Sequence, residues 1–212
     1  MLLREQETLL NKEEFQRLLT PERRAFILEC IRGGLEDYKN ADFYSDAARR
    51  DHNPRVRANL RNCHIVGRAC RAVVGRSDIR VFQRRGRVLF IIADTCVVSF
   101  KMFKRFLRTA NIPTRQAEDY TRQNLFGLDL PPEMTGLCAG YLYEASETSY
   151  QMYITCPYDQ ENLWVWKLPG AEITDFLTST EQEPSVGTIE LAPRKRRVRI
   201  RAEVTKQDAE NG

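Results

Sequence analysis

Four arginines and one histidine occur at intervals of 4, 3, 4 and 3 residues in the middle of the chain, at Arg57, Arg61, His64, Arg68 and Arg71. On an α-helix this spacing gathers all five side chains on one face, which we call the arginine stripe. Guanidinium groups three or four residues apart repel one another unless an anion lies over them. Phosphates of nucleic acid, or an acidic surface of a partner protein, would supply that anion. The alternative is a hydrated face with acidic neighbours elsewhere in the fold.

Two further segments are rich in cations. One is a predicted turn with Arg84, Arg85 and Arg87, and the other is a basic tail with Arg194, Lys195, Arg196, Arg197, Arg199 and Arg201. We expect these residues and the arginine stripe to bind nucleic acid, because contacts with phosphates provide affinity without sequence selectivity. The alternation of Val198 and Ile200 with arginines also fits an edge strand. A tail that is only solvated is a third interpretation.

The charge of the chain is segregated along its length, although the net charge is only +4. Residues 53–110 carry 14 basic and 2 acidic side chains, whereas residues 111–193 carry 3 basic and 13 acidic ones. Either the two segments neutralise each other in the fold, or they form a surface with one positive and one negative face. In the second case we expect a protein partner on the acidic half.

Catalytic motifs are not evident. The sequence has no phosphate-binding loop, no dinucleotide-binding glycine pattern and no zinc-peptidase or serine-hydrolase motif. We therefore expect a chain without catalytic residues and keep a nuclease as the alternative. In that case His64 would transfer the proton while arginines bind the phosphate. Asp94 and Lys101 would belong to the nuclease site as well, although Lys101 with Lys104, Arg105 and Arg108 extends a positive surface more naturally.

Metal binding is not indicated by the cysteines. The six thiols are scattered at Cys30, Cys63, Cys70, Cys96, Cys138 and Cys156, and none forms a C-x-x-C pair. Only two histidines, His52 and His64, are present, whereas structural zinc sites need close ligand pairs. We expect buried, reduced thiols, with no metal and no cofactor.

Trp164 and Trp166 lie two residues apart, so they point to the same face of a strand. Such a pair usually lines a core or a surface on which a helix packs. If the pair is exposed, it indicates a site for a protein partner.

The first part of the chain has a helical pattern. Asn11 is a candidate N-cap for a helix over 12–19, and Thr20 with Pro21 begins a helix over 21–40 that Gly33 and Gly34 weaken, end or kink. Residues 42–54 are expected to be a loop. A third helix runs from about Pro54 to Gly75. The residues expected on its apolar face are Val56, Leu60, Cys63, Val66, Cys70, Val73 and Val74.

The second part alternates with the period of strands. The predicted strands cover 79–85, 87–94, 95–103, 137–145, 149–157 and 163–168, and a helix begins near Thr114. We predict an α+β fold in which N-terminal helices pack on an antiparallel sheet of about six strands, arranged as two three-strand meanders. Residues 1–177 would form one domain, with a helical part over 1–75 and a sheet part over 79–168. Residues 178–212 would be a linker and the basic tail.

No apolar run approaches the roughly 18 residues that cross a bilayer. The N-terminal segment carries acidic residues and lacks the pattern of a signal peptide. We expect a cytoplasmic protein that does not bind membranes.

Four short stretches carry a resemblance to a known group of proteins: SFKMFKR, NIPTRQAEDY, GYLYEA followed by ITCP, and WVWKL. In order and spacing they resemble uncharacterised bacterial proteins that accompany helix-turn-helix regulators and zinc-peptidase-like partners in toxin–antitoxin or phage-defence loci. The similarity covers residues 54–168. It points to Phe100, Lys101, Asn111, Pro113, Thr114, Gln116, Tyr141 and Trp166. The resemblance implies a regulatory role that depends on a partner, and implies no reaction.

These observations lead to one expectation and two alternatives. The expectation is a non-enzymatic bacterial or phage regulatory protein that binds DNA or RNA through phosphates and also binds a protein partner. The alternatives are a nuclease, and a pure interaction subunit or inhibitor whose arginines contact an acidic protein surface.

Overall fold

The computed structural model describes residues 5–41, 44–84, 86–109, 114–144, 149–169 and 173–174. The chain divides into two units, Met1–Leu177 and Thr178–Gly212, and every described residue belongs to the first. The helical part consists of η1 (Gln6–Thr8), α1 (Lys12–Leu18), α2 (Pro21–Lys39), α3 (Asp46–Asp51) and α4 (Pro54–Ala72). In the part of the chain that is described, no helix combines the length and apolarity needed to span a membrane.

The helix starts follow from local sequence. Asn11 and Glu14 form the capping box of α1, in which each side chain accepts a hydrogen bond from the backbone N–H of the other residue. Thr20 caps α2 and Pro21 occupies its first turn, as predicted. The predicted loop over 42–54 is wrong, because it contains α3. Ser45 caps this short helix by accepting a hydrogen bond from the Ala48 N–H.

The sheet contains β1 (Ile79–Arg84), β2 (Arg87–Ile92), β3 (Cys96–Met102), β4 (Thr135–Tyr143), β5 (Ser149–Tyr158) and β6 (Glu161–Lys167), which lie side by side in this order. A short strand, β7 (Ile173–Thr174), pairs with β5. The fold is therefore α+β with its main helices N-terminal, and β1–β3 and β4–β6 form the two antiparallel meanders that were predicted.

The two meanders are joined differently from the prediction of an antiparallel sheet, because β3 and β4 are parallel. The connection between them contains η2 (Arg105–Leu107), α5 (Arg115–Thr121) and η3 (Leu125–Leu128). It returns the chain to the end of the sheet at which β3 began, which forces β4 to run in the same direction. The sheet is thus mostly antiparallel with one parallel pair.

The turns of the first meander show a similar partial agreement. Gly86 has φ +76°, as the predicted tight turn requires. The second turn is longer than the predicted Asp94–Thr95 pair, because Ile92 pairs directly with Cys96 and leaves three residues between them. Ala93 and Asp94 both have left-handed backbones in this turn, with φ +50° and +51°.

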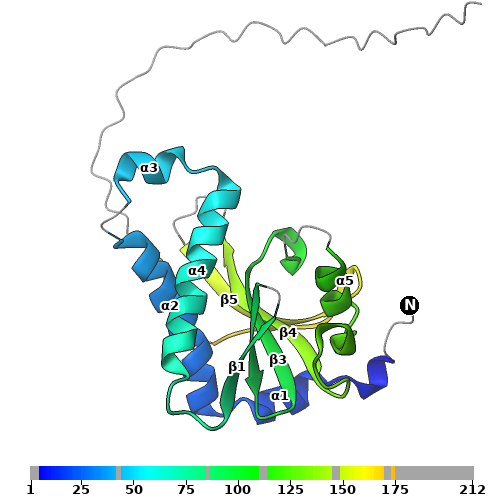
Figure 1. The fold of residues 1–212 in the computed structure, drawn as a ribbon. Coiled ribbons are helices and arrows are strands. Elements are labelled where there is room, and N and C mark those ends of the chain that lie inside the picture. The colour runs from blue at the N-terminus through cyan, green and yellow to red at the C-terminus, as the bar shows by residue number, and fades with distance from the viewer. Residues whose placement is uncertain are drawn as a thin grey trace, which may run out of the picture. The chain divides into compact units, whose positions relative to one another are not determined.

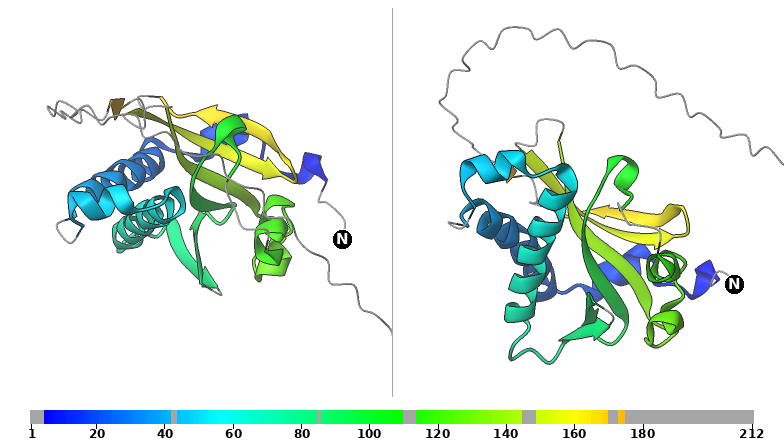
Figure 2. Two further views of the ribbon diagram at one scale, coloured as in Figure 1. Left: turned by 90° about the horizontal axis from the view of Figure 1, so that it is seen from above. Right: turned by 45° about the horizontal axis from the view of Figure 1, so that its top comes forward.

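The sheet is covered on both faces. Figure 2 shows α2 and α4 on one side of it and α5 on the other. Val98 and Phe100 of β3 belong to the core on the side of α2 and α4, whereas Val97 belongs to the core beneath α5. This alternation is the period of two that a strand buried on both faces requires.

α2 and α4 lie side by side in Figure 1 and pack closely. The expectation that Gly33 and Gly34 end or kink α2 is wrong, because the helix continues to Lys39. These glycines instead permit close approach. A Cβ on Gly34 would lie 2.5 Å from the Ile65 Cα, and a Cβ on Gly33 would lie 2.2 Å from the Arg68 Cζ. The position of α4, and hence of its arginines, depends on this contact.

Two buried polar side chains fasten α5 and the segment after it to the sheet. The Tyr120 hydroxyl lies 2.9 Å from the Val97 carbonyl oxygen and 2.5 Å from that of Leu137. The Gln123 amide donates to the Gly136 and Pro157 carbonyls and accepts from the Gly136 N–H. Because these buried groups are satisfied, they hold the connection between β3 and β4 in one position.

Candidate nucleic-acid interface

The apolar face predicted for α4 is confirmed in part, because Val66, Cys70 and Val73 are partly buried and pack against the core. Ile65 and Ala69 are buried, whereas Cys63 is exposed and Val74 is 83% exposed. Ile65, which was not among the predicted apolar residues, is buried because it lies directly against Gly34 of α2. This buried face borders the arginine stripe, which therefore lies along the edge of the α2–α4 contact.

The C-terminal half of the arginine stripe is paired within the fold. The Arg68 Nη1 atom lies 2.8 Å from Oδ1 of Asp37, and the Arg71 Nη2 atom lies 3.7 Å from its Oδ2. Asp37 is on α2, so these pairs cross the helix contact. One carboxylate opposite two guanidinium groups removes part of their positive charge from the surface.

The N-terminal half of the stripe faces a pocket. Arg57 and Arg61 line a pocket of about 300 Å³ together with Lys104 and Arg105, which follow β3. The remaining lining residues are Pro54, Met102, Phe103, Leu142, Tyr143 and Glu144. Four cations and one carboxylate are therefore among the described residues that line this pocket, and the cations come from two segments more than 40 positions apart. We call this site the basic pocket.

Contacts with aromatic and backbone groups hold the two stripe residues of the basic pocket. The Arg61 Cζ atom lies 4.5 Å from the ring centroid of Tyr143 and 5.4 Å from that of Tyr38. Arg57 Nη1 donates a hydrogen bond of 3.1 Å to the His52 carbonyl oxygen. These contacts orient both side chains at the edge of the basic pocket.

The loop after β3 carries the other two cations of the basic pocket. The Phe103–Thr109 bridge and a 2.8 Å hydrogen bond from the Lys104 N–H to the Arg108 carbonyl oxygen close it. Its sequence, KRFLR, places a phenylalanine among three cations. Among the described residues, no carboxylate forms an ion pair with Lys104, Arg105 or Arg108. We call residues 104–108 the basic loop.

His64 lies against aromatic rings, with its centroid 6.0 Å from that of Tyr38 and 6.4 Å from that of Tyr44. Tyr44 also contacts His52 edge-on, at 5.6 Å. Both histidines therefore pack where α3 meets α2 and α4. His64 shares the stripe with the arginines, but it is not one of the residues that line the basic pocket.

The predicted cations of the β1–β2 hairpin contact the segment around α5. Arg84 Nη2 lies 2.5 Å from Oδ2 of Asp129. Arg87 donates to the Gln116 carbonyl oxygen, and its Cζ lies 4.3 Å from the Tyr120 ring centroid. The first pair joins the basic and acidic segments of the chain. Arg85 lies outside the described residues.

The structure does not bring together the residues named for a nuclease. Asp94 forms an ion pair with Arg80 at one end of β3, and Lys101 lies at the other end, about 16 Å of strand away at roughly 3.3 Å per residue. Lys101 is half-buried, and burial lowers its pKa, with a smaller contribution from the charge of Arg87. Within the described part of the chain, no three His, Cys, Asp or Glu side chains are grouped so that they could hold a metal ion.

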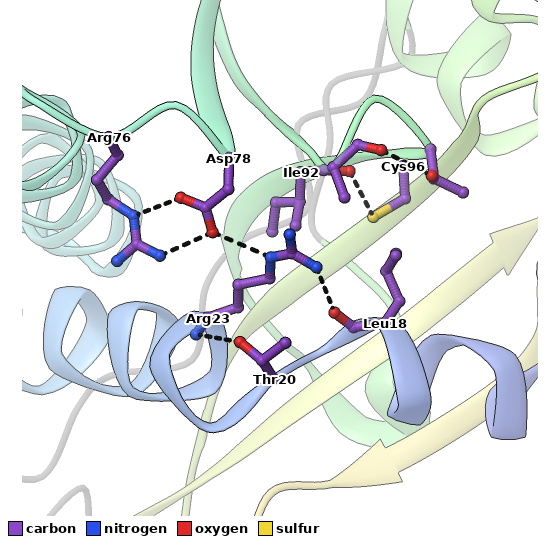
Figure 3. Close-up of polar contacts among 9 residues, drawn as sticks. Leu18, Thr20, Arg23, Arg76, Asp78, Ile92 and Cys96 are labelled. Carbon is purple, nitrogen blue, oxygen red and sulfur yellow. Dashed lines mark hydrogen bonds and ion pairs between the residues drawn. The ribbon is translucent and has the colours of Figure 1, made fainter.

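Asp78 pairs with Arg76, the arginine that follows α4. Asp78 accepts hydrogen bonds from Arg76 and Arg23, each at 3.0 Å, and Arg23 also donates to the Leu18 carbonyl oxygen (Figure 3). These contacts, those of Arg76 first, lower the pKa of the Asp78 carboxyl to about 2. The cluster joins α2 to the start of β1.

Trp164 and Trp166 share a face, as predicted, and α1 covers it. The Trp164 ring stacks on Phe15 with a centroid distance of 5.5 Å, and its indole N–H donates to the Leu10 carbonyl oxygen. Trp166 contacts Phe15 edge-on at 6.1 Å. Both rings are half-buried, which is the helix-packing arrangement. Their role toward a protein partner stays a prediction.

The remaining predicted site residues lie in different settings. Phe100 and Tyr141 are core residues, and Thr114 caps α5 by accepting a hydrogen bond from the Ala117 N–H. Asn111, Pro113 and the whole basic tail, from Arg194 to Arg201, lie outside the described residues. The proposed roles of these residues in binding therefore stay predictions.

The cysteines are reduced, and Cys63 is exposed whereas Cys30, Cys96, Cys138 and Cys156 are buried. Burial raises the pKa of Cys30 and of Cys96 to about 12, and that of Cys138 to about 11. Buried thiols with such a pKa are poor nucleophiles near neutral pH.

One residue of this surface was not named from the sequence. Phe106, in the basic loop, is 76% exposed. A phenylalanine three residues after a predicted strand resembles a core residue, and only the neighbouring cations Lys104, Arg105 and Arg108 marked it as different. Comparisons with protein-family models, curated proteins and solved structures gave no match to this chain.

Proposed function

We propose that this protein binds nucleic acid through phosphate contacts, and that the basic pocket and the basic loop form the centre of the interface. The supporting observation is that Arg57, Arg61, Lys104 and Arg105 line one pocket, where Glu144 is the one carboxylate among the described lining residues. Cations that are held close together in a fixed arrangement are suited to a polyanionic backbone. The proposal covers the binding activity and leaves the regulatory setting and the protein partner as expectations.

The proposed interface is narrower than the one expected from the sequence. Arg68 and Arg71 already share Asp37, and Arg84 is paired with Asp129. A guanidinium that leaves such a carboxylate for a phosphate exchanges one charged partner for another and gains less. We therefore assign the main contribution to the pocket, with Arg108 at its margin.

The test is a fluorescence-anisotropy titration of the full chain with labelled 20-nucleotide DNA and RNA between 50 and 200 mM salt. We expect affinity to fall steeply with salt, because each phosphate neutralised contributes about 0.7–0.9 to the slope of log K against log salt concentration. The double variant Lys104→Gln/Arg105→Gln should bind about tenfold more weakly at 50 mM salt and reduce that slope by about 1.5.

The matched control is Arg68→Gln/Arg71→Gln, which lowers the net charge by the same amount at the half of the stripe that Asp37 neutralises. It should weaken binding by about threefold or less. A chain that shows no binding at 50 mM salt, or binding insensitive to salt, would overturn the proposal. Equal losses for both variants would show that net charge, and not the basic pocket, determines affinity.

A further inference from the structure

Phe106 stands out among the large apolar side chains of the described residues. Only Val74, Val81, Phe106 and Phe126 are exposed there, and Phe106 is 76% exposed. An aromatic ring left in water gives up the favourable free energy of burying its apolar surface. A single exposed apolar residue is common on protein surfaces, so exposure alone carries no conclusion. The backbone and the neighbours of Phe106 do.

The basic loop holds Phe106 outward in an uncommon conformation. Phe106 and Leu107 are consecutive residues with left-handed backbones, at φ +64° and +55°. For residues other than glycine this conformation costs on the order of 1 kcal/mol each, and it persists only where surrounding contacts impose it.

Contacts made by Leu107 impose this conformation on the basic loop. Leu107 donates its N–H to the Lys104 carbonyl oxygen at 3.0 Å, and its own carbonyl accepts a hydrogen bond from the Asn162 side chain of β6. The Leu107 side chain packs against the core beneath α5. The loop is therefore anchored on both sides of Phe106, and the ring is presented to solvent by a fixed backbone rather than by a frayed one.

One cation contacts the ring, and two more belong to the same loop. Arg105 Cζ lies 5.2 Å from the Phe106 ring centroid, and Lys104 and Arg108 close the loop on either side. Proteins bind single-stranded nucleic acid by combining an exposed aromatic ring with nearby cations. The bases stack on the ring while the cations contact the phosphates. In a duplex the bases are already stacked inside the helix and cannot reach such a ring.

We infer that the protein prefers single-stranded over double-stranded nucleic acid, with Phe106 as the stacking platform for a base whose flanking phosphates enter the basic pocket. This inference rests on the proposed function and adds the class of ligand. DNA and RNA share the required chemistry, because every base has a π-face.

The experiment compares labelled oligo(dT) and oligo(U) of 12 nucleotides with a 12-base-pair duplex, using the full chain at 50–200 mM salt. We expect tighter binding of the single strands. Phe106→Ala and Phe106→Leu should each weaken single-strand binding about tenfold, since stacking of one base contributes about 1–3 kcal/mol. The salt slope and the affinity for the duplex should stay unchanged. Phe106→Trp should retain single-strand binding, and its fluorescence should be quenched when the oligonucleotide is added.

The matched control is Phe126→Ala. Phe126 is 75% exposed in η3, and no cation contacts its ring among the described residues. This variant should bind all three ligands within twofold of the unmodified protein. A common unfolding midpoint in urea will show that the variants are folded.

The possible outcomes separate the two proposals. Salt-dependent binding that is equal for duplex and single strand, and that Phe106→Ala does not change, overturns this inference and leaves the proposed function standing. The inference is also overturned if Phe106→Ala weakens single-strand binding and Phe106→Leu does not. An apolar contact without a stacking ring would then be sufficient for binding. Failure of every nucleic acid to bind overturns both.

Discussion

The two ends of α4 carry the same residue type and use it differently. At the C-terminal end, Arg68 and Arg71 lie against Asp37, and Arg76 just beyond the helix lies against Asp78. At the N-terminal end, Arg57 and Arg61 line a pocket together with Lys104 and Arg105. The first group joins α2, α4 and β1 to one another, whereas the second gathers positive charge at one point of the surface.

An arginine stripe is therefore not a functional unit by itself. The surroundings of the two halves differ. α2 supplies the Asp37 carboxylate to Arg68 and Arg71, whereas the loop after β3 places Lys104 and Arg105 beside Arg57 and Arg61. The C-terminal end of α4 can therefore be tested by measuring stability, and the N-terminal end by measuring nucleic-acid binding.

We expect the largest effect on stability from the contact between Gly34 of α2 and Ile65 of α4. Gly34→Ala should lower the free energy of unfolding by about 2 kcal/mol, because its Cβ would lie 2.5 Å from the Ile65 Cα and the two helices must move apart. The loss should appear although alanine is intrinsically favoured over glycine in a helix by about 1 kcal/mol. Urea unfolding followed by circular dichroism measures it.

Gly67→Ala is the control within α4. A Cβ at this position meets only the Arg71 Nη1 atom, at 3.6 Å, so alanine should stabilise the protein by up to about 1 kcal/mol. Opposite signs for the two variants are the expected outcome. Two variants that both stabilise would show that α2 and α4 do not approach as closely as described.

The next effect concerns the dependence of stability on pH. The pKa of Asp78 is lowered to about 2 in the folded chain, so its carboxylate stabilises the fold above about pH 4 and loses this contribution as the pH falls toward 2. Asp78→Asn should cost about 1 kcal/mol at pH 7, a value that allows for solvent screening of the partly exposed carboxylate. Urea unfolding of both proteins at pH 7 and at pH 2.5 should show the difference shrink at low pH. A difference of the same size at both values would mean that the charge of Asp78 contributes nothing.

The smallest effect on stability should come from Asp37→Asn, which removes the carboxylate shared by Arg68 and Arg71. We expect a loss of about 0.5 kcal/mol, since partly exposed pairs contribute little. The same change should increase the positive charge that Arg68 and Arg71 present at the surface. It should tighten nucleic-acid binding by about threefold at 50 mM salt and steepen the salt dependence. Weaker binding would contradict the assignment of Asp37 as the neutralising group.

Much of the local structure could be read from the sequence, because local rules determine it. The caps at Asn11 and Thr20 are set by residues within three positions of each other. The six main strands follow from apolar alternation. The parallel pairing of β3 with β4 could not be read in the same way, since it depends on where α5 carries the chain.

The candidate site was predicted in part. Arg57 and Arg61 were chosen for their spacing, and they line the basic pocket. Arg68 and Arg71 had the same spacing, but a carboxylate 30 or more positions earlier in the chain neutralises part of their charge. Phe106 escaped attention because exposure and backbone conformation are not properties of a residue type.

The amino-acid sequence was sufficient to predict α1, α2 and α4, the caps at Asn11 and Thr20, the six main strands, the excess of positive charge over 53–110 and the placement of the arginines on one face of α4. These properties depend on neighbours within about four residues, where backbone geometry is the same in any fold. Tertiary structure alone decided which face of α4 is buried, which arginines meet Asp37 and which meet Lys104 and Arg105. Electrostatic pairing depends on distance in space, and only the packing of α2, α4 and the loop after β3 sets those distances.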